Sequence, residues 1–179
     1  MTQDVLTLLT QDHQAAEALL QGFDDTVPAD RAEYFCEVAH TLVGHEVAEE
    51  LVVYPALRAG SEKSEEITEA RLGEQAQVEQ TLAELEDLDP QSGAFTNKFK
   101  KLRDAVVAHA KAEESTAFPL LKQATTAQQR KELGDRYQKA HDTAPTHPHP
   151  HAPDTPPGNK IAGPIAALFD RTRDAVHRI

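Results

Sequence analysis

The sequence predicts an all-α protein, and three observations support this fold class. Strong helix formers such as Ala, Leu, Glu, Gln and Lys dominate the 179 residues. Apolar residues recur three and four positions apart over long stretches, which is typical of amphipathic helices. The sequence has no runs of alternating Val, Ile, Thr or Tyr and no Asn-Gly turn, the usual signs of strands and hairpins. We therefore expect an up-down four-helix bundle with a short fifth helix and a Pro-rich C-terminal tail.

The first two expected helices cover about residues 4–23 and 30–59. The segment DDTVP at 24–28 separates them, because it interrupts the apolar pattern and ends in proline. We expect Pro55 to bend or interrupt the second helix, since proline lacks an amide donor and clashes with the preceding turn.

The remaining helices follow from the same apolar pattern. The third and fourth cover about residues 62–88 and 94–122, and the turn sequence DPQSG at 89–93 separates them. A shorter fifth helix is expected over about 126–139, beginning after a threonine cap.

The composition changes after the fifth helix. Residues 144–158 (APTHPHPHAPDTPPG) cannot form a helix because too many of them lack an amide proton. We expect this stretch, with its histidines, to be a solvated linker with polyproline character. A short helix over 161–179 is expected to follow it. The expected organisation is a bundle with its accessory helix over 1–142 and a linker with a C-terminal helical segment over 143–179.

Composition also limits the class of partner. The net charge is -12 with histidine counted as neutral, and this argues against nucleic-acid binding, which needs clustered Lys and Arg. The single cysteine, Cys36, permits neither an internal disulfide nor a cysteine-based zinc cluster, which suits a reducing cytoplasm. We see no basic N-terminal region and no run of about 18 apolar residues, so we expect neither a signal peptide nor a membrane span.

An internal repeat relates the second and fourth expected helices. Each contains His-x-x-x-Glu followed by an aromatic-proline pair. The two copies are HEVAEELVVYP at 45–55 and HAKAEESTAFP at 109–119. The repeat indicates two similar halves, which is a common way to build a bundle around a central site.

The repeated motif places its histidine and glutamate on the core side of the helix. Residues four apart share a face, and Leu42 and Val52 lie on the face of His45 and Glu49. Burying an ionised carboxylate there costs several kcal/mol unless it is paired or binds a metal. A single motif of this kind usually indicates a surface ion pair, but two copies at the same point of two halves favour a shared site.

The expected site therefore combines three imidazoles with two carboxylates. They are His13, His45, Glu49, His109 and Glu113. Imidazole and carboxylate without thiolate suit iron or manganese better than structural zinc, and two carboxylates that can bridge indicate a dinuclear site. For His13 alone, the alternative of a hydrogen-bonded core histidine stays open. The neighbouring glutamates are expected on the solvated or interhelical side: Glu46, Glu50 and Glu114.

These motifs, with their aromatic-proline endings, resemble the hemerythrin HHE cation-binding family over about residues 4–122. The resemblance implies an up-down bundle with a non-haem di-iron centre, oxo- or hydroxo-bridged. It implies that Glu49 and Glu113 bridge the two irons and that the three histidines are terminal ligands. The Pro-rich tail is also similar to the ends of actinobacterial members.

One position departs from the family pattern, which expects a histidine on the third helix within a Glu-His pair. Here the pair reads Glu74-Gln75, and the next turn offers Glu79. Three outcomes are open. The iron nearest this helix gains an oxygen ligand from Glu74 or Tyr54, or Gln75 coordinates it weakly or holds a water. In the third outcome, the site binds one metal only. A Tyr54 phenolate is a hard ligand that stabilises ferric iron and disfavours reversible oxygen carriage; its alternative role is packing before Pro55.

The resemblance implies binding of, or reaction with, hydrogen peroxide, nitric oxide or oxygen at an open iron position. We expect a redox-active protein of oxidative or nitrosative stress defence, with catalase- or peroxidase-like or nitric oxide-consuming activity as the possible enzymatic forms. One alternative is a sensor in which the docking of residues 161–179 changes with ligand. Another is iron storage without catalysis. A monomer or a weak homodimer is expected.

Overall fold

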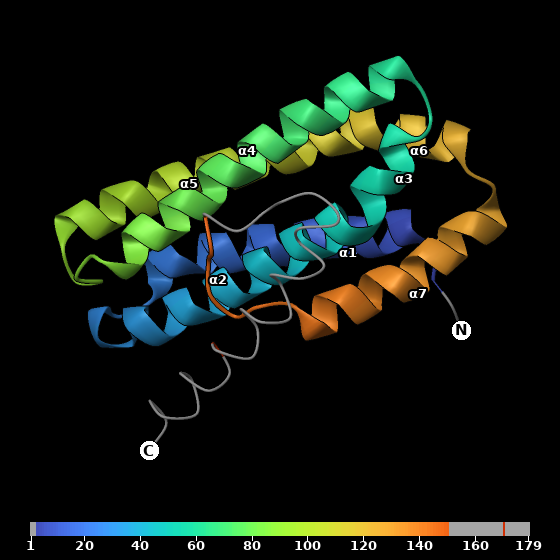
Figure 1. Ribbon diagram of the computed structural model, residues 1–179. Coiled ribbons are helices and arrows are strands. Elements are labelled where there is room, and N and C mark those ends of the chain that lie inside the picture. The colour runs from blue at the N-terminus through green and yellow to red at the C-terminus, as the bar shows by residue number, and fades with distance from the viewer. Residues whose placement is uncertain (1–2, 151–169, 171–179) are drawn as a thin grey trace.

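The computed structural model describes residues 3–150 and residue 170, and within this part of the chain it contains helices and no strands. The helices, in chain order, are α1 (Val5–Gly22), α2 (Arg31–Ala48), α3 (Tyr54–Arg58), α4 (Glu62–Glu86), α5 (Gly93–Ala112), α6 (Phe118–Ala124) and α7 (Ala127–Thr143). Figure 1 shows α1, α2 with α3, α4, and α5 with α6 as the rods of an up-down bundle, with α7 outside them. The predicted all-α bundle is confirmed. No helix in the described residues is long and apolar enough to cross a membrane.

Polar side chains cap several helix N-termini. The side chains of Asp4, Ser61 and Ser92 each accept a hydrogen bond from a backbone amide in the first turn of α1, α4 and α5. Thr126 and Gln129 form a reciprocal capping box at the start of α7. Caps of this kind contribute about 1 kcal/mol each, and they fix where each helix begins.

A π-helical turn interrupts two helices at corresponding points. These turns are Glu49–Val53, between α2 and α3, and Glu113–Ala117, between α5 and α6. In each, the first carbonyl accepts the backbone amide five residues later. The next residue is Pro55 or Pro119, which has no amide to donate and clashes with the preceding turn. The interruption predicted at Pro55 is therefore a widened turn, a feature common at functional sites.

Two apolar clusters fill the bundle, and the polar site lies between them. One cluster gathers near the α1–α2 and α4–α5 connections and includes Leu20, Phe23, Phe35, Leu82, Phe95 and Phe99. The other gathers near α3, α6 and α7 and includes Leu9, Val52, Leu57, Leu121 and Tyr137. His13 on α1, Gln75 on α4 and His109 on α5 each fall between residues of the two clusters along the chain, so the site sits in a water-poor region of low dielectric.

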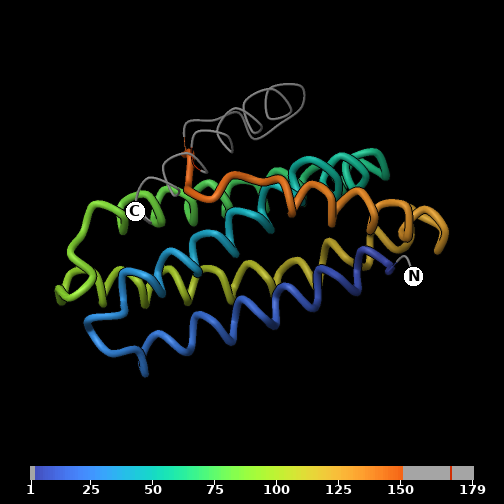
Figure 2. Tube along the Cα trace, turned by 90° about the horizontal axis from the view of Figure 1, so that it is seen from below, coloured from blue at the N-terminus to red at the C-terminus, as the bar shows by residue number. Residues whose placement is uncertain are grey.

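The fifth helix, α7, is longer than the short segment expected over 126–139. It packs against α1, α2 and the first π-helical turn. Figure 2 shows it lying along the outside of the bundle beside α2. The bundle side chains on this flank are therefore covered by protein.

The segment after α7 is not solvated as expected over 144–150. Pro145 and Pro148 are buried, and Nδ1 of His147 lies 2.7 Å from Oε1 of Glu86 on α4. The His149 amide donates to Glu79 at 2.8 Å. The expectation is wrong here because acidic side chains of α4 pair with the histidines and amides of this segment. The helix expected over 161–179 lies outside the described residues, apart from residue 170.

Candidate metal centre

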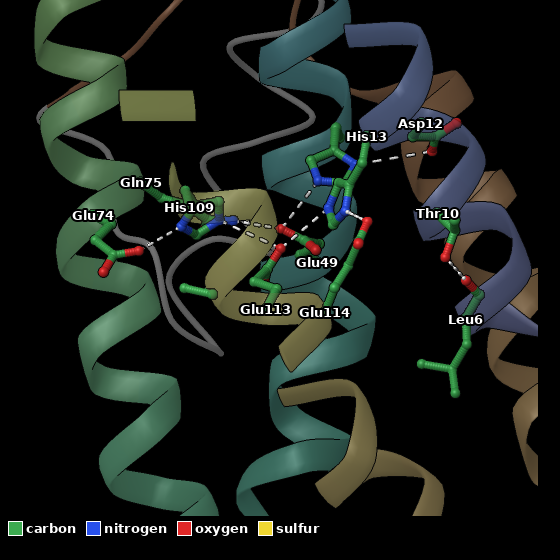
Figure 3. A network of polar contacts seen from close by, with 12 residues as sticks. Leu6, Thr10, Asp12, His13, Glu49, Glu74, Gln75, His109, Glu113 and Glu114 are labelled. Atoms are coloured by element: carbon green, nitrogen blue, oxygen red, sulfur yellow. Dashed lines mark hydrogen bonds and ion pairs between the residues drawn. The ribbon is translucent and has the colours of Figure 1, made fainter. Parts of the chain in front are cut away.

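The predicted ligands converge in the middle of the bundle. Ligand atoms of His13, His45, Glu49 and Glu113 all lie within 4.8 Å of one another, and all four residues are buried. His109 joins them through Nε2, which lies 3.5 Å from Oε2 of Glu113. Figure 3 shows His13 and His109 approaching the two central glutamates from opposite sides. The structure thus brings all five residues to one place from three bundle helices and the two π-helical turns.

The Nε2 atoms of the histidines face the two carboxylates. Nε2 of His13 lies 3.2 Å from Oε2 of Glu113, and Nε2 of His45 lies 3.4 Å from Oε2 of Glu49. Several of these buried atoms have no hydrogen-bond partner: Nε2 of His13 and His109, Oε1 of Glu49 and Oε2 of Glu113. Buried polar atoms without a partner are rare, and a metal ion would satisfy all of them. The nitrogen and carboxylate donors, without thiolate, fit iron.

Each of the three histidines has an oxygen partner at Nδ1, on the side away from the carboxylates. The partners are Glu114 for His13 at 2.9 Å, Tyr137 for His45 at 2.8 Å and Glu74 for His109 at 2.8 Å. Such a partner fixes the ring orientation and the tautomer, so that Nε2 keeps its lone pair for a metal. The histidines are therefore held with their coordinating nitrogens inward.

Tyr137 belongs to α7, outside the four expected bundle helices. Its hydroxyl donates to Oδ2 of Asp12 at 2.7 Å, so its oxygen is left to accept from Nδ1 of His45. The ring is buried, with 1% of its surface exposed. Sequence reasoning did not identify Tyr137 or Asp12, because nothing in their local pattern marks a contact across three helices.

Three residues are candidates to replace the histidine that the family pattern expects on the third bundle helix, α4. Two of them contact the central carboxylates. The Tyr54 hydroxyl donates to Oε1 of Glu113 at 2.8 Å and lies 3.3 Å from Oε2 of Glu49. Nε2 of Gln75 donates to Oε2 of Glu49 at 2.6 Å, and its Oε1 is buried without a hydrogen-bond partner. Glu74 instead lies on the far side of His109 in Figure 3 and contacts its Nδ1 atom.

Without a cation, the two central carboxylates differ in their protonation. Burial, reinforced by the charge of Glu113, raises the pKa of Glu49 well above its ordinary value. Burial alone would also raise the pKa of Glu113, but the adjacent imidazole of His13 and the nearby charges of His109 and His45 lower it to about 2. Burial and the two carboxylates raise the pKa of Tyr54 well above its ordinary value. The site thus accommodates a second negative charge poorly unless it also holds a cation.

Two of the three neighbouring glutamates lie closer to the site than expected. Glu46 is buried, with 7% of its surface exposed, so of the two expected positions it takes the interhelical one and not the solvated one. It lines a cavity together with Val78 of α4 and Val106 of α5. Glu114 is partly exposed but contacts His13 directly. Glu50 is partly buried.

Comparison with known proteins places this geometry in a family context. The chain matches the family model described as the hemerythrin HHE cation binding domain over residues 4–121. It is 25% identical to an uncharacterized hemerythrin-like protein of Schizosaccharomyces pombe over 170 residues, which is 94% of this chain and 84% of the relative. It is 29% identical to a DNA nickase of Nostoc sp. over 141 residues, which is 77% of this chain but 38% of that protein. No solved structure gives a significant match.

Proposed function

Because this chain belongs to the hemerythrin HHE cation-binding domain family, we propose that its central cluster holds a pair of iron ions and binds or reacts with small oxidants or diatomic molecules. One observation supports this proposal most strongly. The Nε2 atoms of three buried histidines face two buried carboxylates, and several of these atoms lack hydrogen-bond partners. A purely structural cluster would leave those atoms at a cost of about 1–3 kcal/mol each.

In the proposed centre, Glu49 and Glu113 bridge the two irons and the histidines are terminal ligands. Tyr54 supplies the oxygen ligand on the side of α4, where the family pattern expects a histidine. Its hydroxyl already contacts both carboxylates. Gln75 holds Glu49 in position through its amide nitrogen. Glu74 orients His109 from outside the ligand set. Two forms compete with this one: Gln75 coordinates weakly or holds a water, or the site binds one metal only.

When bound, the iron pair supplies a Lewis-acidic ligand position and a change of valence. The protein's contribution is to hold the carboxylates and imidazoles at fixed positions between two apolar clusters. The oxygen partners at Nδ1 restrict rotation of each imidazole. The Tyr54 hydroxyl donates to Glu113 and helps to hold that carboxylate in position.

The physiological part of the proposal is defence against peroxide or nitric oxide, with catalase- or peroxidase-like or nitric oxide-consuming turnover. A phenolate ligand favours the ferric state, which supports turnover over reversible oxygen carriage. We place the protein in the cytoplasm, as a monomer or weak homodimer, without nucleic acid as a partner because its net charge is -12. The name DNA nickase describes a relative of which the match covers 38%, and that activity is not part of the proposal.

A sensor is the second proposed function, and one contact favours it. Tyr137 links His45 to α7, and the chain continues from α7 into the segment that packs on α4. A change in the position of His45 on ligand binding would alter this contact. The sensor reading predicts a change in the docking of α7 with ligand, which amide hydrogen exchange measures.

Reaction of the ferrous protein tests the proposed function. The iron-loaded full-length protein, reduced without oxygen, is mixed with hydrogen peroxide or nitric oxide while the near-ultraviolet and visible spectrum is followed. A spectral change that saturates at one ligand or oxidising equivalent per site supports the proposal. The control is the same amount of free ferrous iron in buffer without the protein. The proposal would be overturned if the protein reacted no faster than the control and gave the same spectral change.

A further inference from the structure

A cavity of about 230 Å³ borders the candidate metal centre. His13, His45 and His109 line one part of its wall, although they come from three different helices. The cavity therefore reaches the gaps between the predicted histidine ligands. The central carboxylates and Tyr54 do not line it, so it approaches the cluster from the imidazole side.

The cavity is larger than the ligands of the proposed function need. A cavity of about 150 Å³ with apolar walls is enough to bind benzene, whereas a single water occupies about 30 Å³. Hydrogen peroxide, nitric oxide and oxygen are close to water in size. Much of the remaining volume here faces aliphatic side chains from three helices, among them Leu42, Val78 and Val106. These aliphatic walls suit the apolar part of a ligand better than they suit ordered water molecules.

Charge limits the occupant further. The polar lining includes three carboxyl groups, Glu17, Glu46 and Glu114, against one lysine, Lys111. Acidic side chains disfavour an anionic ligand at short range. The apolar walls disfavour any charged group, because its hydration would be lost.

We infer that this cavity binds the apolar body of an uncharged organic hydroperoxide with its oxygen end toward the three histidines. The binding part of this inference depends on the cavity alone. The reaction part rests on the proposed function, because it needs the iron site. Reduction of the hydroperoxide to its alcohol and water takes two electrons and two protons. The two ferrous ions of the proposed centre supply one electron each, and solvent supplies the protons. The proposed substrate class thus extends beyond hydrogen peroxide to organic hydroperoxides about the size of a substituted benzene.

Binding is tested first with a product-like alcohol that undergoes no redox reaction. The full-length protein, with the metal it holds as purified, is titrated calorimetrically with 2-phenylpropan-2-ol. Saturable binding at one site is expected, and benzoate, an anion of similar size, is expected not to bind. Absence of saturable binding by the alcohol, or equal binding of benzoate, would overturn the proposal.

Two substitutions at Val106 give a matched pair. Val106→Phe fills the cavity and is expected to weaken alcohol binding by about tenfold or more, whereas Val106→Ala enlarges the cavity and keeps the binding. Circular dichroism and metal content establish that each variant retains its fold and its site. If Val106→Phe disturbs either, Val78→Phe, which fills the same cavity from α4, replaces it. Unchanged binding in a folded, cavity-filled variant would also overturn the proposal.

The reaction itself separates the two proposals. With ferrous protein, Val106→Phe is expected to lower the rate of oxidation by cumene hydroperoxide about tenfold or more relative to the rate with hydrogen peroxide. Equal slowing with both peroxides would contradict a role of the cavity in recognition. Failure of the unaltered protein to react with either peroxide would overturn the peroxide form of the proposed function, while the calorimetric result would still decide whether the cavity binds the apolar body.

Discussion

The Tyr137 hydroxyl of α7 lies 2.8 Å from Nδ1 of His45 on α2. A helix outside the four-helix bundle therefore contacts a residue that we propose as a metal ligand inside it. The same hydroxyl donates to Asp12 on α1, so one phenol joins three helices next to the site. The position of His45 depends on the docking of α7.

Tyr137→Phe is expected to weaken iron binding by about 10- to 100-fold, because the phenyl ring keeps the packing but removes the oxygen that fixes the His45 ring. Competition with a chelator measures the change. Tyr34→Phe is the matched control, since the Tyr34 hydroxyl donates to the carbonyl of Leu19, away from the site. Equal iron affinity in the Tyr137 variant and the control would show that the contact does not support the metal.

Tyr54→Phe is expected to abolish any visible charge-transfer band from phenolate to ferric iron. The hydroxyl lies within hydrogen-bonding distance of Glu113, so the substitution also removes a donor to a proposed bridging carboxylate. The optical spectrum of the oxidised protein measures the band, and iron content is determined on the same sample. An unchanged spectrum with full iron content would exclude Tyr54 as a ligand.

Gln75→His is expected to provide the helix-three imidazole that the family pattern expects. Gln75 is buried and already contacts Glu49, so a histidine there starts within reach of the cluster. We expect slower loss of iron to a chelator and a weaker phenolate band, because the new nitrogen competes with Tyr54. Gln75→Leu, which has a similar volume and no donor atom, serves as the control. Loss of iron in the histidine variant as fast as in the leucine variant would contradict this placement of Gln75 on α4.

His109→Ala is expected to lose metal and stability together, because metal binding to a folded site adds directly to folding free energy. Iron should raise the midpoint of thermal unfolding of the unaltered protein and leave that of the variant nearly unchanged. Glu74→Gln, which keeps a hydrogen-bonding group beside His109, should show an intermediate response. Retention of stoichiometric iron by His109→Ala would contradict the assignment of this histidine.

Much of the fold and the centre of the site could be predicted from local sequence patterns. Apolar periodicity and turn residues located the bundle helices to within a few residues. The spacing of four between His45 and Glu49, repeated at His109 and Glu113, placed these side chains on core faces because helical geometry alone sets that relationship. Pro55 marked a helix interruption for an equally local reason, the missing amide.

The surroundings of the site could not be predicted in the same way, because they depend on packing between distant segments. Glu46 was expected on a solvated or interhelical side, and it lies buried beside a cavity that residues of α4 and α5 also line. Glu114 reaches His13 on another helix, a contact that no spacing within the sequence encodes. The polar residues of 144–150 pair with acids of α4, although the proline content of this segment suggested a solvated linker.

The most direct test of the proposed centre is the metal content and optical spectrum of the protein as purified. We predict two irons per chain, with near-ultraviolet bands of an oxo-bridged pair that change on addition of peroxide or nitric oxide. Protein without iron, or with zinc alone and no such bands, would contradict the di-iron proposal and leave the cluster as a buried polar feature of the bundle.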